Sequence, residues 1–120
     1  MSLQLTVPLS YHSSNAYERG QVCNGCGTGG WKGKLVPDTI WFLNVREACD
    51  IHDWMYHEGK TQKDKEIADR VFHHNMRLII EDGSWWKWLA RLRKIRAFTY
   101  YTAVAKFGDS AFWANKERID

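Results

Sequence analysis

The 120-residue sequence has no apolar run long enough to cross a membrane, because a membrane-spanning helix needs about 20 such residues. Its first ten residues, MSLQLTVPLS, have neither the basic start nor the apolar stretch of a signal peptide. We therefore expect no transmembrane segment. Either the protein is made without a signal peptide, or an upstream segment precedes this sequence.

Internal repeats, low-complexity linkers and a strong net charge are also absent. A chain of 120 residues can bury one core, and 44% hydrophobic with 26% charged residues indicate a globular rather than a disordered protein. The net charge of +3 is too small to indicate a nucleic-acid partner by itself. We expect a single domain over residues 1–120.

Cysteine is scarce, and its number is odd. Three cysteines are compatible with one disulfide plus a free thiol, and also with a metal site. Two of them, Cys23 and Cys26, lie in the segment VCNGCGTGGWKGK, which also holds five of the nine glycines. Because glycine lets a backbone approach another group closely, this segment suits a plain connection, a zinc knuckle, a phosphate cradle or a cation site.

Helices are expected from residue 44 onward, after an irregular region with a short strand or turn at TIWFL (39–43). The first begins at Asn44, an N-cap with Glu47 in the capping-box position, and stops at Gly59. The second spans about 62–81, and the brief connection GKT makes the two helices antiparallel neighbours. Their expected apolar faces are Val45, Ala48, Cys49, His52, Met55 and Tyr56, then Ile67, Ala68, Val71, Phe72, Met76 and Ile79.

A third helix, over about 85–107, is basic and opens with three of the seven tryptophans, which completes a mainly α fold class. It contains no Asp or Glu, and two interpretations stay open. In one, its apolar side chains form core with the other helices: Trp88, Leu89, Leu92, Ile95, Phe98 and Tyr101. In the other, the helix docks on an anionic lipid surface through Trp85, Trp86, Lys87, Arg91, Arg93 and Lys94. Nucleic acid is not expected, because nothing in this helix recognises bases.

His52 and Asp69 are the best-placed pair for acid–base chemistry. His52 lies seven residues before Gly59 and Asp69 seven after Gln62, so both are about 10 Å from the connection on facing helices. A carboxylate there can fix one imidazole nitrogen and leave the other as a base. Tyr56, one turn from His52, can hydrogen-bond the same carboxylate.

The plainer interpretation of this pair is structural. A histidine on an apolar helix face is commonly a core residue. Asp69 is then a helix-surface acid paired with Lys65 or His73.

The segments GCGTGG and CDIHDWMY together resemble the calcium loop and active-site helix of the secreted phospholipase A2 superfamily. The few cysteines resemble its microbial or viral branch, and IADRVF is similar to the segment that carries the catalytic aspartate there. The resemblance covers about residues 23–76. It implies a glycine-rich calcium loop before an antiparallel two-helix catalytic core. The implied activity is calcium-dependent hydrolysis of the sn-2 ester of glycerophospholipids at a membrane surface, in a secreted or virion- or prophage-associated protein.

The resemblance also implies a role for each matching residue. The ligands of Ca²⁺ would be three main-chain carbonyls and both oxygens of one carboxylate, from Gly25, Gly27, Gly29 and Asp53. His52 would activate a water that Asp69 and Tyr56 help to orient, and the N–H of Gly27 would stabilise the oxyanion. A disulfide between Cys26 and Cys49 would hold the loop beside the helix.

Two alternatives remain beside this interpretation. The pairs Cys23-x2-Cys26 and Cys49-x2-His52 have the spacing of a Cys₃His zinc site, which would make the protein a structural zinc-binding module that interacts with nucleic acid or protein. The two hypotheses exclude each other at His52, which cannot be both zinc ligand and base. A catalytically silent relative that only binds lipid is the other alternative.

Overall fold

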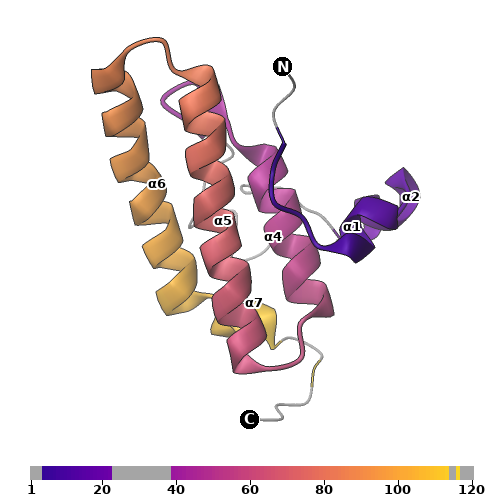
Figure 1. Ribbon diagram of the computed structural model, residues 1–120. Coiled ribbons are helices and arrows are strands. Elements are labelled where there is room, and N and C mark those ends of the chain that lie inside the picture. Colours follow the sequence, from indigo (N-terminus) through magenta and orange to yellow (C-terminus); the bar gives the residue numbers. More distant parts are fainter. Residues whose placement is uncertain (1–3, 23–38, 114–115, 117–120) are drawn as a thin grey trace.

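The computed structural model describes residues 4–22, 39–113 and 116. It is mainly helical, as predicted, with one small antiparallel sheet. Three long helices lie side by side in Figure 1: α4 (Arg46–Glu58), α5 (Gln62–Gly83) and α6 (Lys87–Phe107). α4 and α5 run antiparallel and α6 returns along α5, so the predicted order of helices is confirmed.

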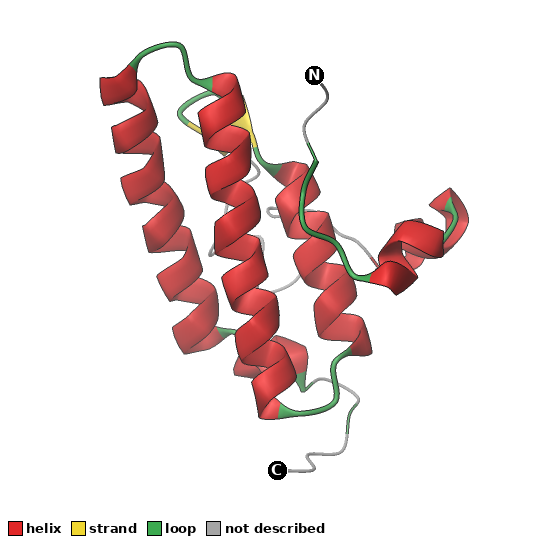
Figure 2. Cartoon of the chain, in the orientation of Figure 1, coloured by secondary structure: helices red, strands yellow, loops and turns green. Residues whose placement is uncertain are grey.

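Short elements flank this bundle at its side and at one end. The helices α1 (Leu9–Ser13) and α2 (Ala16–Val22) and the segment before them lie beside α4 (Figure 2). The side-chain amide of Asn75 on α5 binds this segment twice, accepting from the N–H of Thr6 at 2.7 Å and donating to its carbonyl at 2.9 Å. At the end of the bundle where α6 stops, α7 (Asp109–Phe112) packs on α4 and α6.

The expected turn at 39–43 is a β-hairpin of β1 (Thr39–Ile40) and β2 (Leu43–Asn44). Its two loop residues, Trp41 and Phe42, have φ angles of 46° and 70°. Positive φ at both loop positions matches the twist of a tight hairpin, although glycine or asparagine usually occupies such positions. The hairpin enters α4 directly.

The start of α4 differs from the predicted capping box. The helix begins at Arg46, whose N–H donates to the Asn44 side chain at 2.7 Å, and its N-cap residue is Val45, whose apolar side chain cannot accept a hydrogen bond. Glu47 does not return to the helix start, because its carboxylate accepts a hydrogen bond from Tyr11 at 3.0 Å. The predicted stop is confirmed, since Gly59 donates to the Met55 carbonyl at 2.9 Å.

The capping box of the bundle lies on α5. The Thr61 hydroxyl accepts from the N–H of Asp64, and the Asp64 carboxylate accepts from the N–H of Thr61, both at 3.1 Å. The helix extends two residues beyond the predicted end, to Gly83. Four of its six predicted core positions are buried, Ala68, Phe72, Met76 and Ile79, whereas Ile67 is 42% exposed and Val71 is half-buried.

The interpretation of the apolar side chains of α6 as core is confirmed only in part: Leu89, Leu92 and Tyr101 are half-buried, and Tyr101 packs against the core. Trp88, Ile95 and Phe98 are each more than half exposed, and the buried positions are Arg93, Ala97, Tyr100 and Val104. The hairpin supplies the reason, because its carbonyls need donors. Tyr100 donates to the Thr39 carbonyl at 2.9 Å and Arg93 to the Trp41 carbonyl at 2.8 Å. These bonds turn the small Ala97 toward the core and the larger apolar side chains outward.

Candidate active site

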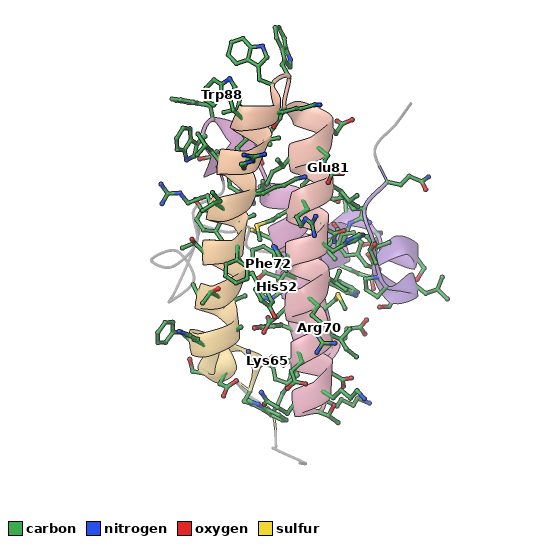
Figure 3. The ribbon with its side chains drawn as sticks, turned by 60° about the vertical axis from the view of Figure 1, so that its left-hand side comes forward. His52, Lys65, Arg70, Phe72, Glu81 and Trp88 are labelled. Carbon is green, nitrogen blue, oxygen red and sulfur yellow. The ribbon has the colours of Figure 1, made fainter. Side chains whose placement is uncertain are left out.

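The predicted pair of His52 and Asp69 lies together in the interior, between α4 and α5. His52 Nε2 is 2.8 Å from Asp69 Oδ1, and their side chains are 0% and 3% exposed. The two residues stand at the same level on antiparallel helices, as the spacing from the connection predicts. Figure 3 shows His52 beside Phe72 at mid-height of the bundle, and the two rings lie 4.7 Å apart.

Tyr56 joins the pair as predicted. Its hydroxyl donates to the same oxygen, Asp69 Oδ1, at 2.7 Å, and its ring lies 4.1 Å from the imidazole. Phe112 of α7 meets the Tyr56 ring edge-on at 5.2 Å and is fully buried. Aromatic side chains therefore contact the His52 imidazole and the Tyr56 ring. These contacts restrict the orientation of both rings.

The hydrogen bonds decide the charge state of Asp69. Burial by itself would raise the pKa of this carboxyl, but the hydrogen bonds from His52, Lys65 and Tyr56 outweigh burial and lower the pKa below its usual value. Burial, followed by the nearby charge of Asp69, raises the pKa of the Tyr56 hydroxyl. At neutral pH the site therefore holds an ionised Asp69 and a protonated Tyr56.

This arrangement selects one tautomer of His52. An ionised carboxylate only accepts hydrogen bonds, so the nitrogen that faces it, Nε2, carries the proton. The lone pair of a neutral imidazole then lies on Nδ1, which is the atom that can take up a proton. The pair thus has the arrangement of a general base and its orienting carboxylate.

Lys65 is the residue of this site to which the sequence interpretation gave no functional role. It stands one turn before Asp69 on α5 and donates to Asp69 Oδ2 at 2.8 Å. The structural interpretation of the sequence paired these two residues on the helix surface, but Lys65 is only 2% exposed. The i,i+4 spacing of Lys65 and Asp69 could have indicated their contact. The sequence did not show that this face of α5 is buried.

The predicted calcium site lies partly outside the described residues. Gly25, Gly27 and Gly29 fall there, as does Cys26, so the calcium loop and the Cys26–Cys49 disulfide stay predictions. Asp53 follows His52 on α4 and is 8% exposed. Within residues 4–22, 39–113 and 116, no three His, Cys, Asp or Glu side chains group as metal ligands.

Cys49 occupies the buried face of α4, one turn before Asp53, and is 1% exposed. The two residues therefore lie one above the other on the helix, as the i,i+4 spacing predicts. A group that holds the Cys49 side chain would consequently sit close to the Asp53 carboxylate.

The predicted lipid-binding residues lie at the start of α6 and just before it, and they divide into an exposed and a less exposed group. Trp85 is 92% and Trp86 58% exposed, and Lys87 and Arg91 are exposed as well. Arg93 is buried, with its guanidinium bound to the hairpin and to the end of α5, so its assignment to the lipid-binding surface is wrong. Lys94 is half-buried and pairs with Glu81 at 3.1 Å.

A groove between α5 and α6 was not predicted from the sequence. It has a volume of about 650 Å³, with Ile95 and Phe98 among its apolar lining. Its cationic lining residues come from both helices: Arg77, Lys87, Arg91 and Lys94. None of the helices in the described ranges is long and apolar enough to cross a membrane.

Comparison with protein-family models, with curated proteins and with solved structures finds no match to this chain.

Proposed function

We propose that this protein hydrolyses the sn-2 ester of glycerophospholipids in a calcium-dependent reaction of the phospholipase A2 type. One observation carries the proposal: the buried contact of 2.8 Å between His52 Nε2 and Asp69 Oδ1, with Tyr56 on the same oxygen. A purely structural histidine needs only one satisfied hydrogen bond. Here an ionised carboxylate with three donors fixes the tautomer, which is the requirement for a general base.

The proton steps follow from this geometry. His52 Nδ1 takes a proton from a water molecule as the water oxygen attacks the ester carbonyl, and Asp69 stabilises the imidazolium that forms. The imidazolium then donates that proton to the glycerol oxygen as the ester bond breaks, which releases a fatty acid and a lysophospholipid. The base is restored and no covalent intermediate forms.

The residues proposed to hold Ca²⁺ are the Asp53 carboxylate and the carbonyls of Gly25, Gly27 and Gly29. Oxygen donors of this kind are the ligands calcium prefers. Asp53 directly follows the proposed base on α4, which supports placing the cation beside the reacting ester. When bound, calcium would polarise the ester carbonyl and stabilise its developing negative charge, together with the N–H of Gly27.

The outer face at the start of α6, together with Trp85 and Trp86 just before it, is proposed to dock the protein on an anionic phospholipid surface. Its apolar side chains are exposed to an extent unusual for a soluble protein, with Trp85, Trp86 and Trp88 all above 50%. Lys87 and Arg91 accompany them, and each cation near such a surface adds about 1 kcal/mol of binding. Tryptophan settles at the level of the lipid headgroups.

The test is release of fatty acid from mixed phospholipid vesicles, first with calcium and then with excess chelator. We expect release that stops on chelation and is abolished by His52→Gln. The variant His74→Gln is the matched control, because His74 is exposed on α5. Calcium-independent release, or activity that survives in His52→Gln, would contradict the proposal. One equivalent of zinc in protein purified under reducing conditions would replace it with the zinc-binding alternative.

A further inference from the structure

Lys65 is a lysine withdrawn almost completely from water, with 2% of its surface exposed. Figure 3 labels it below His52, near the lower end of α5. A buried ammonium is stable only when every donor finds an acceptor. Lys65 meets this requirement with three acceptors, which matches the three hydrogens of the group: Asp69 Oδ2 at 2.8 Å, the Val104 carbonyl at 3.2 Å and the Ala105 carbonyl at 3.3 Å.

The two carbonyls belong to the last turn of α6. Carbonyls there carry the negative end of the helix dipole. The Val104 carbonyl accepts from the N–H of Gly108 at 2.8 Å and from Lys65 as well. The Lys65 ammonium therefore joins two negative groups, the end of α6 and the Asp69 carboxylate. Asp109 of α7 also lies nearby, with a carboxylate oxygen 3.6 Å from Lys65 Nζ.

We propose that Lys65 is a positioning residue that determines which way the residue at position 69 turns its oxygen atoms. An ammonium can donate but never accept, so an oxygen of residue 69 must face it. The other oxygen of the carboxylate is thereby directed at His52 and Tyr56. Lys65 Nζ lies 5.9 Å from the centre of the Tyr56 ring, and Lys65 acts on His52 through Asp69. The catalytic consequence rests on the proposed function, whereas the effect on the tautomer does not.

An amide at position 69 makes the proposal testable. Asn has one oxygen and one NH₂ group in place of two equivalent oxygens. In Asp69→Asn, the Lys65 ammonium donates to the amide oxygen, so the NH₂ group faces His52 Nε2 and donates to it. His52 must then carry its proton on Nδ1, which is the tautomer that cannot act as base. The Tyr56 hydroxyl does not oppose this change, because a hydroxyl can accept as well as donate.

Removing the lysine charge should reverse this effect. In the double variant Asp69→Asn with Lys65→Met, nothing requires the amide oxygen to face α6, so it can turn to His52 and restore the proton on Nε2. The double variant also removes both charges of the pair together, which a buried site tolerates better than the loss of one. The matched control carries Asp69→Asn with Lys63→Met, because Lys63 is an exposed lysine on the same helix.

The measurements are the ¹⁵N NMR shifts of the His52 ring, which report its tautomer, thermal unfolding, and calcium-dependent fatty acid release from vesicles. We expect the Nδ1-protonated form in Asp69→Asn and in its Lys63 control, and the Nε2-protonated form in the Lys65 double variant. Fatty acid release should fall about 10³-fold in Asp69→Asn and recover at least about tenfold in the Lys65 double variant.

The outcomes separate this inference from the proposed function. The same tautomer in Asp69→Asn and in the Lys65 double variant would overturn the positioning role. So would a double variant that unfolds while Asp69→Asn stays folded, because Lys65 would then serve mainly to close α6. A tautomer switch without fatty acid release from the wild-type protein would support the positioning role and reject the hydrolase.

Discussion

Removing the Tyr56 hydroxyl tests the buried network without assuming any activity. The variant Tyr56→Phe keeps the ring, with its contacts to His52 at 4.1 Å and Phe112 at 5.2 Å. It removes only the donor that lies 2.7 Å from Asp69 Oδ1. The change in the free energy of unfolding therefore reports the contribution of the Tyr56 hydroxyl.

The expected loss of stability follows from the acceptor's charge. A hydrogen bond to an ionised group contributes about 1.5–3 kcal/mol. Asp69 keeps its bonds to His52 and Lys65 in the variant, so we expect the lower part of this range, about 1.5–2 kcal/mol at pH 7. For a domain of this size that loss lowers the melting temperature by about 5–8 °C.

The same reasoning fixes the sign of the pH dependence. The hydrogen bonds lower the pKa of Asp69 in the folded protein below that of an unfolded aspartate, about 3.9. The stability they provide is complete above that value and is lost as the pH falls through the folded pKa. Because Tyr56 supplies part of this stability, the difference between wild type and Tyr56→Phe should shrink in acid.

The assay is denaturant unfolding followed by circular dichroism at pH 7 and at pH 3. Tyr17→Phe is the control, because Tyr17 is 74% exposed on α2 and should change stability by less than about 0.5 kcal/mol. A difference below about 0.5 kcal/mol for Tyr56→Phe at pH 7 would refute the reasoning. A difference that is equal at the two pH values would refute the charge assigned to Asp69.

Three further changes are expected to act in different ways. Gly108→Ala places a methyl group against the Val104 carbonyl and the Tyr56 hydroxyl and should lower stability by about 1–3 kcal/mol in thermal unfolding, whereas a methyl group at Gly20 meets no atom of the described residues within 4 Å, so Gly20→Ala should not. Arg93→Met should lower stability by about 2 kcal/mol or more through three lost hydrogen bonds, while the exposed Arg91→Met should weaken sedimentation with anionic vesicles at unchanged stability. Asp53→Asn should raise the calcium concentration for half-maximal hydrolysis at least about tenfold, and an unchanged value would place the cation elsewhere.

The register of the candidate site could be predicted from the sequence because α4 and α5 are joined by a short connection. Equal numbers of residues from that connection put His52 and Asp69 at one height, whatever else the fold does. The i,i+4 spacing likewise placed Tyr56 within reach. Local geometry was sufficient for these three residues.

The caps and the face of α6 could not be predicted in the same way. Glu47 had the right spacing for a capping box, but Tyr11, 36 residues earlier, supplies a donor that competes with the helix start. Along α6, hydrophobicity favoured Trp88, Ile95 and Phe98 as core. Hydrogen bonds from Tyr100 and Arg93 to hairpin carbonyls turn a different face of α6 toward the core.

The sequence by itself determined that this protein is a small helical domain in which an imidazole and a carboxylate face each other across two antiparallel helices. Only the tertiary structure decided the surroundings of that pair. It buried Lys65 against the end of α6 and withdrew Arg93 from the surface, while it left Trp85, Trp86 and Trp88 around the start of α6 exposed. The physical reason is that helical periodicity fixes which residues share a face, whereas the partner of a polar group depends on which distant carbonyl or carboxylate folding brings beside it.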